Sequence, residues 1–118
     1  MLKVRTDGPG SPNWVSTKTE RASHRMEPLS YQGDPTAALD RLASIIAEMP
    51  GAKIVARDNT SVVATFTSRI FRFVDDVIFE VDDQSNQIHF SSSSRVGRSD
   101  LGANRKRMTT ITTAWSSS

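Results

Sequence analysis

The stretch from Gly33 to Gly51 reads GDPTAALDRLASIIAEMPG and predicts the most distinct element of the chain. Asp34 is suited to cap the start of a helix, and Pro35 is suited to its first turn. Apolar residues then recur at helical spacing and form one face, through Leu39, Leu42, Ile46 and Met49. Because a proline and a glycine follow directly, we expect an amphipathic helix that begins after Asp34 and ends near residue 49.

Four segments after this helix have the composition and the alternation typical of β-strands. They cover residues 52–57, 61–67, 71–82 and 87–93. Short runs of turn-forming residues join the first strand to the second and the third to the fourth, which predicts two hairpins. A further short run, residues 26–31, predicts an edge strand ahead of the helix.

The last predicted element is a second amphipathic helix that starts near Asp100. Its apolar face carries Asn104 and is otherwise formed by Leu101, Met108, Ile111 and Trp115. Hairpin-length connections imply an antiparallel sheet. We therefore predict a two-layer α+β domain over residues 25–118, in the order β-α-β-β-β-β-α, with four to five strands and both helices on one face. Residues 1–24 are rich in glycine and proline, which predicts an irregular arm that packs on the domain.

Composition excludes several classes of protein. The chain has 118 residues, a formal net charge of +2 and no cysteine, so disulfides, thiolate catalysis and cysteine-based zinc sites are excluded. Its two histidines, His24 and His89, lie far apart in the sequence, and we predict neither a metal site nor a cofactor. No apolar run is long enough to span a membrane, and the first residues lack the apolar region of a signal peptide. We expect a cytoplasmic location if Met1 is the native start, and a periplasmic, envelope or organellar location if the chain is processed.

Charged residues form two opposed patches in the second half of the chain. The basic patch holds Arg95, Arg98, Arg105, Lys106 and Arg107, and the acidic patch holds Asp75, Asp76, Glu80, Asp82 and Asp83. On the helical pattern, residues 105–107 are expected to face solvent, with contact to phosphates or acidic lipid headgroups as the alternative. Aromatic residues do not interleave with these basic residues, which argues against a nucleic-acid partner.

A polar corner is predicted where the third strand meets the last helix. Asp75 alternates in step with Val77 and Phe79, so its carboxylate should point toward the core while that of Asp76 points away. Because a buried carboxylate needs a partner, we expect Asp75, Arg95 and Asn104 to meet in one network. Two interpretations are open: a staple that fixes strand and helix, or a polar site with donors left for a ligand.

The turn between the last strand and the last helix has the ingredients of an anion site. It follows four serines, Ser91 to Ser94, and carries Arg95 and Arg98 ahead of a helix N-terminus. If Asp100 caps the helix, it occupies the donors that an anion would need. Any anion is then expected near Arg95 and Arg98.

Three blocks of the sequence resemble the bacterial and plant family known as domain of unknown function 1499. They are residues 11–16 (SPNWVS), residues 73–76 (FVDD) and residues 94–107 (SRVGRSDLGANRKR). The chain departs from the family where Trp14 stands in place of a frequent cysteine and where Ser91 stands in place of a frequent arginine. Many relatives carry membrane or export segments ahead of this domain. The resemblance implies no activity, but it implies a shared polar corner onto which the N-terminal arm folds, formed by Asn13, Asp75, Asp76, Arg95, Asp100, Asn104 and Arg105.

Three functions are compatible with these observations. The first is a non-catalytic binding domain whose polar corner receives an anionic ligand or an acidic segment of a protein partner. The second is an accessory subunit of a larger complex, which could be associated with a membrane. The third is a hydrolase-like enzyme that uses Asp75 or Asp76 as acid or base, and it ranks last because the sequence shows no recognisable nucleophile and base.

Overall fold

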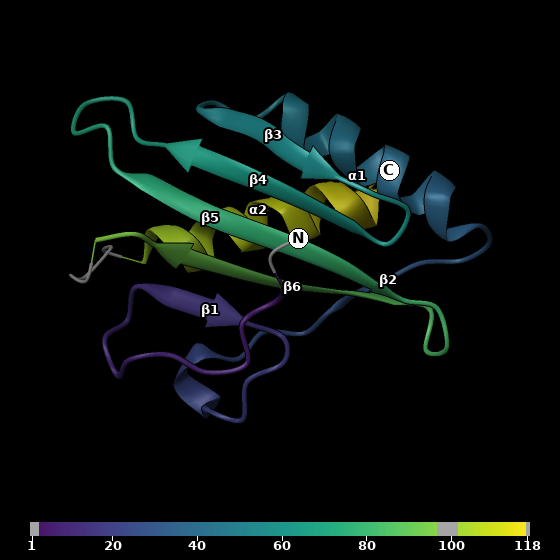
Figure 1. The fold of residues 1–118 in the computed structure, drawn as a ribbon, viewed down its shortest axis with the longest axis horizontal. Coiled ribbons are helices and arrows are strands. Elements are labelled where there is room, and N and C mark those ends of the chain that lie inside the picture. Colours follow the sequence, from purple (N-terminus) through teal and green to yellow (C-terminus); the bar gives the residue numbers. More distant parts are fainter. Residues whose placement is uncertain (1–2, 97–101, 118) are drawn as a thin grey trace.

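A six-stranded antiparallel sheet and two α-helices make up the fold (Figure 1). The computed structural model describes residues 3–96 and 102–117. The strands lie in the order β1-β6-β5-β4-β3, and β2 also pairs with β6. The predicted α+β class and the order β-α-β-β-β-β-α are confirmed. The elements are β1 (Trp14–Ser16), the 3-10 helix η1 (Ala22–His24), β2 (Leu29–Ser30), α1 (Pro35–Ala47), β3 (Ala52–Arg57), β4 (Ser61–Thr67), β5 (Val74–Asp82), β6 (Gln87–Ser94) and α2 (Ala103–Ser117).

Helix α1 begins and ends where the sequence predicts. The side chain of Asp34 accepts a hydrogen bond from the Thr36 amide at 3.3 Å, and Pro35 is the first helical residue. After the helix, Gly51 has a φ of +76°, and a Cβ at this position would lie 2.4 Å from the Thr67 carbonyl oxygen. Glycine is therefore required there on two counts, because the chain must turn and must also approach the end of β4 closely.

The main core lies between the sheet and the two helices, which both cover the same face of the sheet (Figure 1). The alternate residues of β4, β5 and β6 supply one side of it, and α1 and α2 supply the other. Met108, Ile111 and Trp115 of α2 are buried, as their spacing predicts. The residues of this core that have no exposed surface are Leu39, Leu42, Ile46, Val62, Ala64, Val77, Phe79, Ile88, Phe90, Met108 and Ile111.

The opposite face of the sheet is partly covered by the N-terminal segment that contains Val4 and Arg5. Val4 packs against Val63 and Ile78 in a second, smaller cluster of buried apolar residues. The next residue, Arg5, donates its backbone N–H to the Ser91 hydroxyl at 3.0 Å. The N-terminal segment thus forms a partial third layer that the prediction of two layers did not include.

Part of the N-terminal arm is regular, so the prediction that residues 1–24 are irregular is wrong in this part. Residues 14–16 form β1, an edge strand that pairs with β6 and gives the sheet six strands where four to five were predicted. Trp14 is buried, stacks on the His24 ring with 4.1 Å between the centroids, and donates its indole N–H to the Pro9 carbonyl at 2.7 Å. A three-residue strand that completes an existing sheet edge has too little alternation to be recognised in sequence.

Strand β5 begins at Val74, three residues later than predicted. Ser68 closes a loop in front of it, because its N–H donates to the Phe73 carbonyl and its hydroxyl accepts from the Phe73 N–H, both at 2.8 Å. Inside the loop Arg72 has a φ of 59°, which interrupts the strand alternation. Alternation along the predicted strand, residues 71–82, would place Phe71 and Phe73 on the buried face with Val77, but both side chains are exposed.

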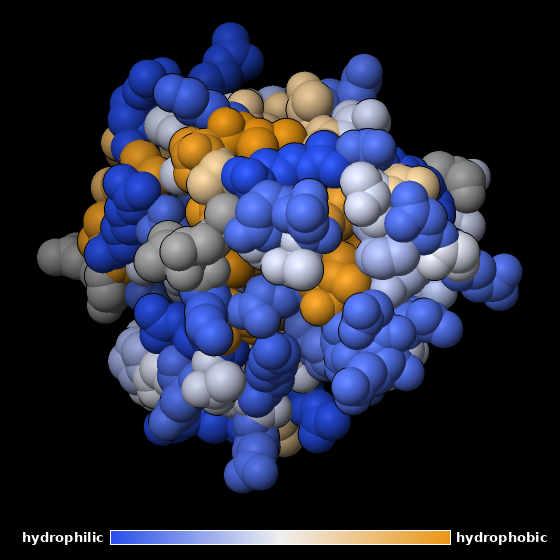
Figure 2. All heavy atoms as spheres, turned by 45° about the vertical axis from the view of Figure 1, so that its right-hand side comes forward, coloured by the Kyte–Doolittle hydropathy of each residue, from blue (hydrophilic) through white to orange (hydrophobic). Residues whose placement is uncertain are grey.

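Hydrophilic side chains form most of the surface on the side seen in Figure 2, and apolar side chains show between them in separate patches. Among the described residues, no helix has the length and apolar character needed to cross a membrane.

Candidate functional site

Asn104 is the centre of a buried polar network at the end of the sheet where α2 begins. Its side-chain amide donates to the Asn13 carbonyl and to the Ser94 hydroxyl, both at 2.9 Å. Its amide oxygen accepts from the Ser92 hydroxyl at 2.6 Å and from Arg107 at 3.1 Å. With no exposed surface, Asn104 joins α2, β6 and the N-terminal arm through hydrogen bonds to each.

Asp75 is buried as predicted, but its partner is Arg107 and not Arg95. The Oδ2 atom of Asp75 lies 2.8 Å from Nη2 of Arg107, and the two side chains are only 11% and 15% exposed. The guanidinium of Arg107 also donates to the Ser92 hydroxyl at 3.1 Å and lies 4.7 Å from the centroid of the Phe66 ring. The prediction that Arg107 faces solvent is therefore wrong, since it follows Asn104 by three positions and lies on the same side of α2.

Arg95 pairs with Asp76, whose side chain points away from the helix-covered face. The ion pair is bidentate, with two N–H···O distances of 3.0 Å, and the Arg95 side chain is 56% exposed. Its hydrogen bond to Asp76 raises the pKa of the Arg95 guanidinium above its usual value. The predicted triad of Asp75, Arg95 and Asn104 is thus replaced by two separate arrangements, one buried and one at the surface.

The N-terminal arm is joined to this corner by two further residues of the predicted set. Asn13 donates its side-chain N–H to the Val96 carbonyl at 2.8 Å, and its own carbonyl accepts from Asn104. Arg105 donates to the Ser23 carbonyl at 3.0 Å. Arg98 and Asp100, the remaining members of the predicted set, lie outside the described residues.

Three of the four serines that were predicted to contribute to an anion site have protein partners. The Ser91 hydroxyl accepts from Arg5, the Ser92 hydroxyl bonds to Asn104 and Arg107, and the Ser94 hydroxyl accepts from Asn104. The polar corner therefore satisfies most of its own donors and acceptors, which is the arrangement expected of a structural staple.

A separate groove, which we call the arginine groove, lies next to the polar corner. Its volume is about 720 Å³, and it runs between the α1–β3 turn and the end of β4. Arg69 and Arg72 line it from the loop after β4, and Arg107 lines it from α2. Among the described residues, neither Arg69 nor Arg72 forms an ion pair with a carboxylate. The other lining residues are Met49, Pro50, Gly51, Ala52, Phe66, Thr67 and Ser68.

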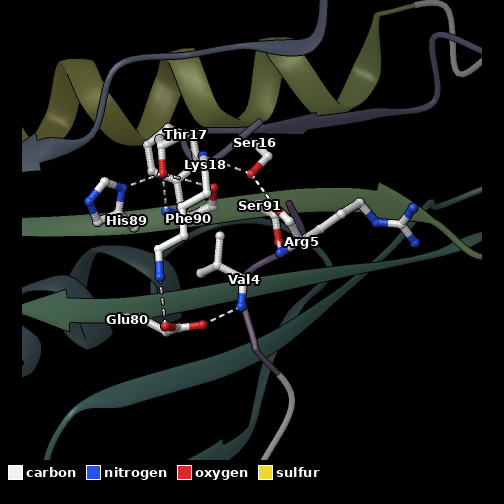
Figure 3. A network of polar contacts seen from close by, with 9 residues as sticks. All are labelled: Val4, Arg5, Ser16, Thr17, Lys18, Glu80, His89, Phe90 and Ser91. Carbon is white, nitrogen blue, oxygen red and sulfur yellow. Dashed lines mark hydrogen bonds and ion pairs between the residues drawn. The ribbon is translucent and has the colours of Figure 1, made fainter. Parts of the chain in front are cut away.

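A second polar network ties the arm to the outer face of the sheet (Figure 3). The hydroxyl of Thr17 lies 2.9 Å from Nδ1 of His89 and accepts from the Phe90 N–H at 3.0 Å. Beside it, Lys18 pairs with Glu80 at 3.2 Å, and Glu80 also accepts the Val4 N–H. Each contact joins the arm to β5 or β6, so this network holds the arm in place.

The imidazole of His89 is expected to titrate below its ordinary pKa of 6.5. Burial lowers the pKa most, and the charge of Lys18 lowers it further, while Asp82 and Glu80 oppose the shift. Because the folded state then binds a proton less readily than the unfolded state, the stabilisation from neutral His89 is present above pH 6.5 and is lost as the pH falls through the lower folded value.

A proton NMR titration of the His89 ring measures this shift directly. Lys18→Gln is the control, because removing the ammonium group should raise the pKa of His89 toward its ordinary value. A folded-state pKa at or above 6.5 in the unmodified protein would contradict the assignment.

Neither an acid–base pair nor a metal site is apparent in the described part of the chain. Each carboxylate of the pair Asp75 and Asp76 is held by its own arginine, on opposite sides of the sheet. Within residues 3–96 and 102–117, no three His, Asp or Glu side chains are grouped as metal ligands would be. In the arginine groove, Arg69 and Arg72 supply positive charge and N–H donors.

These observations define a small α+β domain with a polar corner, whose side chains bond mostly to one another, and an adjacent groove lined by arginines. The chain matches the family described as protein of unknown function (DUF1499) over residues 4–114, and it belongs to this family. No curated protein and no solved structure matches the chain.

Proposed function

We propose that this domain is a non-catalytic binding domain that receives an anionic group in the arginine groove. One observation carries the proposal: three arginine side chains line one groove, and two of them have no carboxylate partner among the described residues. Unpaired guanidinium groups beside a concave surface favour phosphate and carboxylate ligands, because the planar fork can donate two parallel hydrogen bonds.

The groove supports this function better than the polar corner does. In the corner, Arg107 and Arg95 each have an aspartate partner, and Asn104 bonds on both its oxygen and its nitrogen. In the groove, Arg69 and Arg72 flank the Ser68 and Thr67 end of β4. Arg107 lies in both, so its ion pair with Asp75 fixes one wall of the groove while the other two arginines supply the uncompensated charge.

Binding of inorganic pyrophosphate, measured by isothermal titration calorimetry, tests this proposal. The double variant Arg69→Gln/Arg72→Gln should weaken binding by at least about tenfold, since each lost charge-assisted hydrogen bond contributes roughly 1.5–3 kcal/mol. Arg25→Gln is the matched control, because Arg25 is also exposed but lies beside η1. Equal affinities for all three proteins, or no binding by the unmodified protein, would refute the proposal.

A further inference from the structure

The loop that joins β4 to β5, residues 68–73, exposes three large apolar side chains. Ile70 is 79% exposed, Phe71 is 73% exposed and Phe73 is 52% exposed. The loop extends past the end of the sheet (Figure 1). Three neighbouring apolar side chains held in water at the tip of one loop are unusual for a surface without a partner.

The loop that exposes these apolar side chains is held by hydrogen bonds and ring contacts of its own. The Ser68 N–H and hydroxyl both bond to the Phe73 backbone at 2.8 Å, and the Arg72 N–H donates to the Ser68 carbonyl at 3.2 Å. The rings of Phe71 and Phe73 stack with 5.7 Å between their centroids. The backbone hydrogen bonds thus hold the aromatic side chains on the outside of the loop.

The same loop carries the unpaired positive charge. Residues 68–73 read SRIFRF, so two arginines lie among three apolar residues, and the segment holds no acidic residue. Val96, which is 43% exposed, adds an apolar side chain at this end of the sheet, where the neighbouring Arg95 N–H bonds to the Val74 carbonyl at 3.2 Å. The tip therefore combines apolar side chains with cations.

We propose that this loop docks the domain on the surface of an anionic lipid bilayer. Ile70, Phe71 and Phe73 enter the interfacial region, and Arg69 and Arg72 bind lipid phosphates. A bilayer accepts a projecting aromatic tip without a preformed pocket, since aromatic rings favour the headgroup level and arginine stems can extend to the phosphates. The inference rests on the proposed function, because the phosphate of the lipid is the anionic group that the arginine groove receives.

Sedimentation with vesicles of phosphatidylcholine, with or without phosphatidylglycerol, tests the inference. The unmodified protein should bind only the vesicles that contain phosphatidylglycerol, and binding should weaken with added salt. Phe71→Ser/Phe73→Ser should lower the partition coefficient by at least about tenfold. Arg69→Gln/Arg72→Gln should lower it by roughly 25-fold, at about fivefold for each arginine near a charged bilayer.

Val55→Ser is the matched apolar control, because Val55 is 49% exposed on β3 and lies outside the loop; it should leave vesicle binding unchanged. The aromatic variant should also keep its affinity for pyrophosphate, which separates membrane docking from anion binding. If the unmodified protein binds pyrophosphate but not vesicles, the membrane inference is overturned and the proposed function stands. If it binds neither pyrophosphate nor vesicles, the membrane inference and the proposed function are both overturned. Equal binding to both kinds of vesicle, or self-association through the aromatic residues in place of vesicle binding, would also overturn it.

Discussion

Replacing Asp75 with alanine is expected to lower the free energy of unfolding by about 3–5 kcal/mol. The carboxylate of Asp75 is the ion-pair partner of Arg107 at 2.8 Å, and both side chains are largely shielded from water. Removing the carboxylate leaves the guanidinium beside the Phe66 ring with two neutral acceptors, Ser92 and Asn104, but without a counter-charge. An unpaired charge that is largely shielded from water lowers the stability of the fold far more than the intact ion pair raises it.

Urea unfolding of the purified variants measures this effect. Lys106→Ala, an exposed change on α2, should stay within about 0.5 kcal/mol of the unmodified protein. The double variant Asp75→Leu/Arg107→Met should be more stable than Asp75→Ala, because no charge is then left without its partner. If Asp75→Ala and Lys106→Ala unfold alike, the buried ion pair does not exist in solution.

Asn104→Ala is expected to destabilise the domain by about 3 kcal/mol, the second large effect. Asn104 has no exposed surface and bonds to groups from three segments of the chain, the N-terminal arm, β6 and α2. Without the Asn104 amide, the Ser94 hydroxyl and the Asn13 carbonyl each lose a hydrogen-bond donor. The substitution also leaves a cavity beside the start of α2. The variant should therefore weaken both the helix contact and the attachment of the arm.

Chemical denaturation combined with amide hydrogen exchange distinguishes these two consequences. Exchange should accelerate at the Ser94 N–H, which bonds to the Asn13 carbonyl at 2.9 Å, and at the amides of β1. Thr109→Ala, an exposed change on the same helix, should leave both the stability and the exchange rates nearly unchanged. Protection of the arm that survives in Asn104→Ala would contradict the linking role of this residue.

Most of the fold could be predicted because its elements carry strong local signals. The capped helix α1 and the hairpin of β3 and β4 combine periodicity with turn residues, and the limits of both strands match the prediction. Burial of Asp75 could be predicted as well, since strand alternation assigns a face to each residue whatever the surroundings.

The partners of the polar residues could not be predicted in the same way. Alternation says which face Asp75 occupies, but the choice between Arg95 and Arg107 depends on how α2 lies across the sheet. Helical spacing from Asn104 to Arg107 was the one signal that could have indicated the correct partner. The exposed loop was missed because Phe71 and Phe73 continue the alternation of β5, and only the positive φ of Arg72 interrupts it.

The central claim is that the polar corner is structural and that Arg69 and Arg72, in the neighbouring arginine groove, carry the binding. Amide chemical shifts of ¹⁵N-labelled protein, followed during titration with pyrophosphate, test it most directly. We expect saturable shifts that are largest at Gly51 and across residues 67–73, where the arginine groove lies. Shifts that are largest at Asn13, Ser94 and Arg105, with residues 67–73 unaffected, would contradict it.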